Sequence, residues 1–259
     1  KYEGRVTMVG NFSEAFAGIF SGLLAVYSLR FPFYVQSGIA FIGIPAAIAL
    51  TEHAAKTRIK NSFANIMKII QYSLFTNKEL CYNIMFSGVI GAATLTMAWF
   101  VQPLLIELDT PTSWFGIIWT ILNLTVGISA LYSDKLDQRL GSLRMYAFIL
   151  FFIVGGYIAV AFNISYVGLI CLFFFYIVRG FATPILKGYI NQITFSEMRA
   201  TVLSIRNFVI RLMFAAMAPL VGWLHDLYSL SIALQATAVI IFVPGLLFLI
   251  LQWRYSKKV

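Results

Sequence analysis

Long apolar runs separated by short polar and basic stretches alternate along this chain. A run of about 20 apolar residues can cross the ~30 Å hydrocarbon core of a bilayer as an α-helix. Backbone polar groups find no water in lipid, so such runs form helices rather than open strands. The pattern predicts eight membrane-spanning helices, at about residues 6–26, 31–50, 80–104, 112–133, 144–162, 165–186, 200–224 and 229–252.

The stretch at residues 52–79 is much longer than the other connections and divides the chain into three parts. We expect two helices in residues 1–51, a linker in residues 52–79 and a six-helix bundle in residues 80–259. Within the linker, apolar residues recur at near-helical spacing with lysines between them: Ile59, Phe63, Ile66, Ile69 and Ile70. This spacing fits an amphipathic helix at the membrane surface, and a solvated linker is the alternative.

Composition excludes a soluble domain, because 60% of the residues are hydrophobic and only 11% are charged. Most of the 19 Lys and Arg residues, Lys187 and Arg206 among them, fall in loops on one side of the predicted membrane, whereas the opposite loops hold Arg30. By the positive-inside rule, this predicts a multi-pass protein of the cytoplasmic (inner) membrane with both chain ends in the cytoplasm. The net charge of +9 then indicates contact with anionic lipid, and no nucleic-acid partner is expected.

Cysteine and histidine usage favours neither a metal site nor a cofactor. Cys81 and Cys171 lie within or at the edge of predicted spans, without a CxxC pair or a histidine cluster, and are best interpreted as two packed thiols. His53 lies in a loop and His225 at a helix end. We therefore expect no metal and no cofactor.

Short motifs at the predicted cytoplasmic helix ends resemble those of one family. The run Ala-Leu-Tyr-Ser-Asp-Lys-Leu-Asp-Gln-Arg at residues 130–139 resembles the Gly-x-Leu-x-Asp-Arg-x-Gly-Arg loop of the major facilitator superfamily, with Ala130 and Asp137 replacing its two glycines. Residues 197–201, Glu-Met-Arg-Ala-Thr, resemble the start of the family's eleventh helix. Gly18-x-x-x-Gly22 is similar to its antiporter motif, although Leu23 stands at the expected proline.

A weak internal repeat agrees with this resemblance: Arg5-Val6-Thr7 followed by Asn11-Phe12, and Arg199-Ala200-Thr201 followed by Asn207-Phe208. The resemblance implies an all-α membrane protein with two major-facilitator-type helical bundles, each of six helices. This chain would supply helices five to twelve, so that eight of twelve transmembrane helices are present and four would precede Lys1. Such a protein would function as a monomer when full length.

The resemblance also implies positions for a gate and a central cavity. The residues of the cytoplasmic gate would be Asp134, Arg139 and Arg199. Without the resemblance, a solvated turn explains these charges equally well. Cavity positions would lie on the family's seventh and tenth helices, at Thr94, Gln102, Tyr176, Arg179 and Thr183. The alternative for the threonines is a hydrogen bond to a neighbouring helix.

Three charged residues fall inside apolar runs, where insertion of a charge costs about 2.5–3.5 kcal/mol: Glu14, Arg179 and Arg211. Glu14 either binds a proton or a cationic group of a substrate, or forms half of a fixed ion pair. Arg211 either anchors an anionic substrate or pairs permanently with a carboxylate. Arg179 either faces the substrate or extends along its helix toward water.

The neighbours of these charges form polar and small stripes at three-to-four spacing, which we expect to face the protein interior. One stripe is Asn11, Glu14, Gly18, Ser21 and Ala25, and the other is Ser204, Asn207, Arg211, Ala215 and Ala218. Their glycines and alanines are expected to let helices approach closely. Asn11 and Asn207 are thereby further candidates for substrate or proton coupling.

Together these features predict a secondary transporter of a small solute, anionic or zwitterionic, with coupling to protons through Glu14 as a hypothesis. The sequence contains no Walker motif, so ATP is not expected to drive transport directly. The alternatives are a membrane-embedded transferase, for which His225 and Asp226 are the available pair, and a membrane protein that binds a ligand without transporting it. The isolated His-Asp pair is more simply a helix terminus, so no enzyme is expected.

Overall fold

The computed structural model describes residues 2–28, 30–49 and 63–256, and every regular element in these residues is a helix. The all-helical prediction is therefore confirmed for this part of the chain. The helices are α1 (Tyr2–Tyr27), α2 (Phe31–Ile48), α3 (Phe63–Gln71), the short π-helix η1 (Tyr72–Thr76), α4 (Lys78–Glu107), α5 (Thr112–Leu140), α6 (Ser142–Phe162), α7 (Tyr166–Ile193), α8 (Arg199–Leu227) and α9 (Leu230–Ser256).

A helix overlies each of the eight predicted apolar runs, and six of them, α4 to α9, are long and apolar enough to cross a membrane. α1 is long enough, but Asn11, Ser13 and Glu14 lower its hydropathy. α2 is also apolar, but its continuously described apolar segment, Phe31–Pro45, is shorter than the spans of α4 to α9. Length and composition thus support a multi-pass membrane protein with six spans in the described residues.

Local sequence signals set several helix ends. The Asn77 side chain accepts a hydrogen bond from the Leu80 backbone N–H at 3.0 Å and so caps the start of α4. Ser165 caps α7 in the same way, accepting from the Val167 N–H at 3.2 Å. Gly141 separates α5 from α6 with a φ of 75°, a conformation that glycine adopts without strain.

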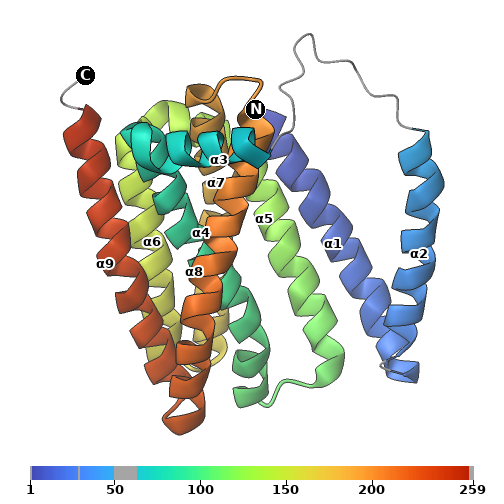
Figure 1. Cartoon of the computed structure of the whole chain (residues 1–259). Coiled ribbons are helices and arrows are strands. Elements are labelled where there is room, and N and C mark those ends of the chain that lie inside the picture. Colours follow the sequence, from blue (N-terminus) through green and yellow to red (C-terminus); the bar gives the residue numbers. More distant parts are fainter. Residues whose placement is uncertain (1, 29, 50–62, 257–259) are drawn as a thin grey trace.

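α4 to α9 pack into one bundle, with α1 lying along α5, and α2 stands at the side of the molecule and approaches α1 near the turn that joins the two helices (Figure 1). The bundle core is aromatic and aliphatic, and Phe86, Leu122, Phe175 and Tyr176 are almost completely buried in it. Tyr157 is also buried and donates from its hydroxyl to the Ala93 carbonyl at 2.6 Å, which joins α6 to α4.

Small residues bring α1 and α5 close together. A methyl group added at Gly18 would lie 3.2 Å from Thr120 Oγ1, and one added at Gly116 would lie 3.2 Å from the Gly18 carbonyl oxygen. The expected role of Gly18 in close helix approach is thereby confirmed. Ala215 on α8 is exposed, so the same expectation is not met there.

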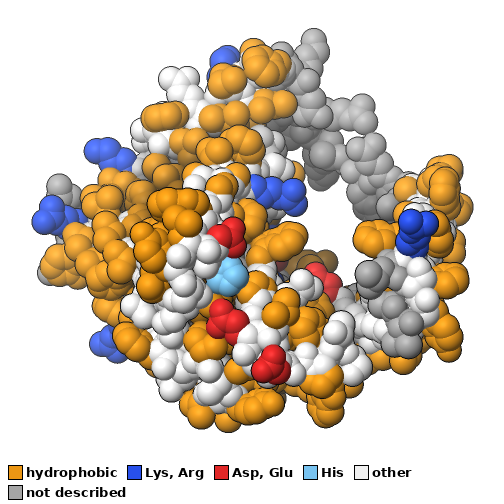
Figure 2. Space-filling model, turned by 90° about the horizontal axis from the view of Figure 1, so that it is seen from below, with side chains coloured by type: hydrophobic (Ala, Val, Ile, Leu, Met, Phe, Trp, Pro, Cys, Tyr) orange, Lys and Arg blue, Asp and Glu red, His pale blue; other side chains and the backbone are white. Residues whose placement is uncertain are grey.

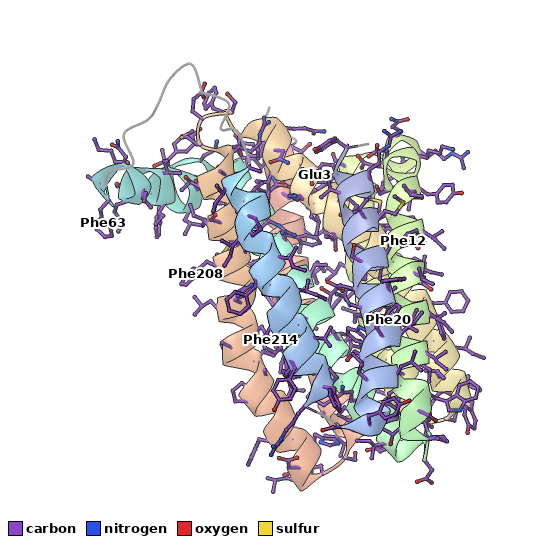
Figure 3. The ribbon with its side chains drawn as sticks, turned by 90° about the vertical axis from the view of Figure 1, so that its right-hand side faces the viewer. Glu3, Phe12, Phe20, Phe63, Phe208 and Phe214 are labelled. Carbon is purple, nitrogen blue, oxygen red and sulfur yellow. The ribbon has the colours of Figure 1, made fainter. Side chains whose placement is uncertain are left out.

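α3 lies across the end of the bundle at which α1 begins and α9 ends, and Figure 3 shows it extending sideways with Phe63 at its far end. Ile69 of α3 is buried against α8, whereas Phe63, Ile66 and Met67 are exposed. Residues 63–76 of the linker are therefore helical, as the near-helical spacing of its apolar residues predicted. Ile59 lies outside the described residues.

Candidate functional site

Polar and charged residues from α1, α5 and α7 meet at one depth of the bundle, and three contacts fix this register. The Phe12 ring packs over Gly127, where an added methyl group would lie 2.6 Å from the ring. Thr120 Oγ1 donates to the Ala15 carbonyl at 3.1 Å. Gly180 of α7 lies against Val126 of α5, with 2.6 Å between an added methyl group and the Val126 carbonyl oxygen.

These contacts place Asn123, Glu14 and Tyr176 at the same level. Asn123 lies between Thr120 and Gly127 on α5, so its level on α1 falls between Phe12 and Ala15, at Glu14. Asn123 and Tyr176 come three and four residues before Val126 and Gly180, one turn along the touching faces. We call Glu14, Asn123, Tyr176 and Arg179 the polar layer.

Arg179 and Tyr176 form the α7 part of the polar layer. The Arg179 guanidinium carbon lies 5.1 Å from the centre of the Tyr176 ring, within range of a cation–π contact. Arg179 Nη1 and the Tyr176 hydroxyl are both buried, and neither makes a hydrogen bond of normal geometry, although the guanidinium is close enough to the hydroxyl to interact with it. Burial of an unsatisfied polar group costs about 1–3 kcal/mol, so native proteins rarely keep several together without a functional reason.

Asn123 adds an acceptor from α5. Its side chain is fully buried and its Nδ2 donates to the Trp119 carbonyl at 3.1 Å, while its Oδ1 has no partner. In the sequence, Asn123 is one of several polar residues within the predicted spans. The signal that distinguishes it is its position one turn from Thr120, on the face of α5 that contacts α1.

Glu14 supplies the negative charge of the polar layer. Its side chain is exposed on α1, at the level that the contacts of Phe12 and Ala15 with α5 set for Asn123. No ion pair between Glu14 and an arginine is present among the described residues. The fixed pair that was one sequence-based interpretation of Glu14 is thus not formed in that part of the chain.

The other coupling candidates lie away from the polar layer. Asn11 donates to the Thr7 carbonyl of its own helix at 2.8 Å. Asn207 and Arg211 are exposed on α8, and Asn207 Oδ1 accepts from Arg206 Nη1 at 3.2 Å. This polar face of α8 is open in the described structure, instead of facing a packed interior as expected.

The remaining predicted cavity positions behave differently from Tyr176 and Arg179. Thr94 donates to the Gly91 carbonyl at 3.0 Å and Thr183 donates to the Arg179 carbonyl at 3.1 Å, both within their own helices. Gln102 is exposed near the end of α4. The structure therefore brings only Tyr176 and Arg179, of the predicted cavity set, into the polar layer.

The predicted gate residues are spread over two helix ends. Asp134 is partly buried and Arg139 is exposed in the last turns of α5. Arg199 donates to the Asn191 and Thr194 carbonyls at 3.1 and 3.4 Å, which satisfies the end of α7.

A further cluster of charged and polar residues, which the sequence did not reveal, links the start of α1 to the last turns of α7. Lys187 Nζ lies 2.7 Å from Glu3 Oε2, and Asn191 Nδ2 donates to Glu3 Oε1 at 2.9 Å (Glu3 is labelled in Figure 3). We call Glu3, Lys187 and Asn191 the α1–α7 clasp. The sequence pattern predicted that Lys187 lies in a loop, but it lies within α7.

Arg206 was likewise assigned to a loop, and this assignment is wrong. It lies inside α8, is 8% exposed, and donates from Nε to Ser87 Oγ of α4 at 2.5 Å. The Glu3 carboxylate acts on it electrostatically. A count of charges around apolar runs misses such a residue, because its single charge is flanked by Ile205 and Asn207 near the predicted start of a span.

The same end of the bundle holds a polar pocket of about 300 Å³ between α4, α6, α7 and α9. Its lining includes Glu79, Asn83, Tyr146, Tyr189 and Gln252. The Tyr146 hydroxyl donates to Asn83 and the Tyr189 hydroxyl donates to Asp137, so these tyrosines are held by partners within the protein.

Acidic side chains surround His225 at the opposite end of the molecule (Figure 2). His225 lies 3.8 Å from Glu107 Oε1 and 3.5 Å from Asp226 Oδ1. The contact with Glu107 joins the ends of α4 and α8, whereas Asp226 is the next residue of α8. No group of His, Cys, Asp and Glu residues suited to a metal ion occurs among the described residues.

Comparison with protein-family models finds no match to this sequence, and comparison with curated proteins finds none either.

Proposed function

We propose that this protein is a secondary active transporter, which carries a small solute across the cytoplasmic membrane by alternating access. The observation that carries the proposal is the polar layer, in which a carboxylate and a guanidinium share one level with two buried, unsatisfied polar side chains. Ionisable groups within spans usually mark a substrate or ion pathway. The polar layer also lies where α1 meets α5 and α7, and transporters commonly bind substrate between two moving helical units.

The proposal assigns α1 and α2 to one unit and α4 to α9 to the other, in a major-facilitator-type arrangement. The motif resemblance at residues 130–139 and 197–201 supports this assignment. So does the close packing of α1 on α5 through Gly18 and Gly116, because this contact joins a helix of residues 1–51 to a helix of residues 80–259 and so lies where the two proposed units meet. The α1–α7 clasp then holds the two units together at the predicted cytoplasmic end.

Coupling to protons is part of the proposal and assigns a role to Glu14. An exposed carboxylate at the level of the polar layer can take up a proton from water on one side and release it on the other. Neutralising Glu14 should therefore separate solute binding from proton movement.

Transport is tested with the full chain in liposomes that contain a pH-sensitive dye. Amino acids, organic acids and sugars are added singly outside, and proton entry that depends on one solute identifies a coupled substrate. Glu14→Gln should abolish this proton entry while exchange of labelled solute continues at a higher solute concentration. Glu197→Gln, which removes an exposed carboxylate from the loop before α8, is the matched control. Unchanged proton entry in Glu14→Gln would remove the coupling role, and the absence of any solute flux would overturn the proposal.

A further inference from the structure

The polar layer offers unmatched groups of both kinds, donors and acceptors. Arg179 Nη1 and the Tyr176 hydroxyl lie close to each other but make no hydrogen bond of normal geometry, and since both are donors, any contact between them still leaves the Tyr176 O–H without an acceptor; Asn123 Oδ1 is a buried acceptor without a donor. Tyr176 and Asn123 are both fully buried, so bulk water does not satisfy them. A ligand that matches all three must carry an acceptor group at one end and a donor group at the other.

The charges of the polar layer restrict that ligand further. Arg179 contributes one positive charge, and Glu14, which the register of α1 on α5 places at the same level, contributes one negative charge. The layer is therefore formally neutral before anything binds. A ligand with a single net charge would leave an uncompensated charge inside the membrane, which is strongly unfavourable at low dielectric.

From these two observations we infer that the solute is a zwitterion that carries a carboxylate and an ammonium group and has no net charge. The inference rests on the proposed transport function and names its substrate class. The carboxylate accepts hydrogen bonds from Arg179 and Tyr176, and the ammonium donates to Asn123 Oδ1 and faces Glu14. Each charge of the solute thus finds an opposite charge, and each unsatisfied buried atom finds a partner.

Other small solutes match the polar layer less completely. A simple carboxylate pairs with Arg179 but leaves Glu14 and the Asn123 acceptor unmatched. A simple amine pairs with Glu14 but leaves Arg179 without an acceptor. A sugar supplies hydroxyl groups for hydrogen bonds but compensates neither charge. A site with buried polar groups discriminates strongly against ligands that leave them unpaired.

Binding to the full chain in lipid nanodiscs tests this inference. The probes are the protein amino acids with uncharged side chains, each compared with its deaminated carboxylate and its decarboxylated amine, and the readouts are calorimetry and the thermal unfolding midpoint. At least one amino acid should bind at least tenfold more tightly than both of its analogues. Equal binding of a carboxylate and its parent amino acid would overturn the inference, as would the absence of binding by every amino acid.

Variants assign the two ends of the ligand. Arg179→Gln should weaken amino acid binding at least tenfold, so that the amino acid no longer binds more tightly than its decarboxylated amine. Arg179→Lys should retain part of this difference in affinity. In Glu14→Gln, the amino acid should no longer bind more tightly than its deaminated carboxylate. Arg144→Gln and Glu197→Gln, which remove exposed charges outside the polar layer, should bind like the unmodified protein. If Arg179→Gln and Arg144→Gln bind alike, the assignment to the polar layer is wrong.

Flux measured on the same protein separates this inference from the transport proposal. An amino acid that binds as expected but is never carried would contradict transport and leave the ligand class standing. Carriage of a simple carboxylate or a sugar, with no amino acid bound, would support transport and overturn the zwitterion.

Discussion

Gly180 occupies the point where α7 presses against α5. A methyl group there would lie 2.6 Å from the Val126 carbonyl oxygen and 2.7 Å from Ser129 Cβ, so neither the backbone nor the short Ser129 side chain can yield easily. We predict that Gly180→Ala lowers the free energy of unfolding by about 1–3 kcal/mol, as expected for overpacking. The thermal unfolding midpoint in detergent, followed by tryptophan fluorescence, measures the change.

Gly188→Ala is the matched control for this substitution, because it lies on the same helix and has no atom within 4 Å of the added methyl group. Removing a glycine from a helix interior stabilises it by about 1 kcal/mol or less, so this variant should melt at or slightly above the original midpoint. Equal loss of stability in both variants would mean that α7 does not approach α5 as closely as described.

At the scale of helices, the α1–α7 clasp makes a charge-reversal prediction. Glu3→Lys should lower the unfolding midpoint more than Lys187→Glu, because a lysine at position 3 adds a cation to the end of the bundle that already holds Lys187 and the buried Arg206. The double variant Glu3→Lys with Lys187→Glu should recover part of the lost stability. It restores a Lys–Glu pair but leaves a lysine instead of a glutamate at position 3. A double-mutant cycle of midpoints measures the coupling.

Arg144→Glu provides the control for the cycle, because Arg144 is exposed at the start of α6 and its reversal should change the midpoint little. Additive effects of Glu3→Lys and Lys187→Glu, with no recovery in the double variant, would show that the clasp contributes nothing to holding α1 on α7.

The helices could be predicted from the sequence because each needs only a local property, a run of apolar residues bounded by polar ones. Glu14, Tyr176 and Arg179 could be named for the same reason, as polar groups inside such runs. Their assembly into one layer with Asn123 could not be predicted, because it depends on the register that Thr120, Gly127 and Gly180 set between helices. The misplacement of Arg206 has a related cause, since only its contact with Ser87 shows that it is buried.

For the molecule as a whole, the alternation of helices places the loop before α8 and the start of α5 at opposite ends of the bundle. The excess of basic residues at the first of these ends predicts that it is cytoplasmic. Ser196 in that loop and Ser113 at the start of α5 are both exposed, and so form a matched pair for labelling.

We predict that a membrane-impermeant maleimide added to intact cells of a Gram-negative host, after opening of the outer membrane, labels Ser113→Cys and spares Ser196→Cys. In inside-out vesicles the pattern should reverse. Cys81 and Cys171 are first replaced by serine, because both are free thiols and only partly buried. Labelling of Ser196→Cys in intact cells would show that the topology is the reverse of the predicted one. The α1–α7 clasp would then close the external side of the polar layer, and the proposed direction of proton entry would have to be reversed.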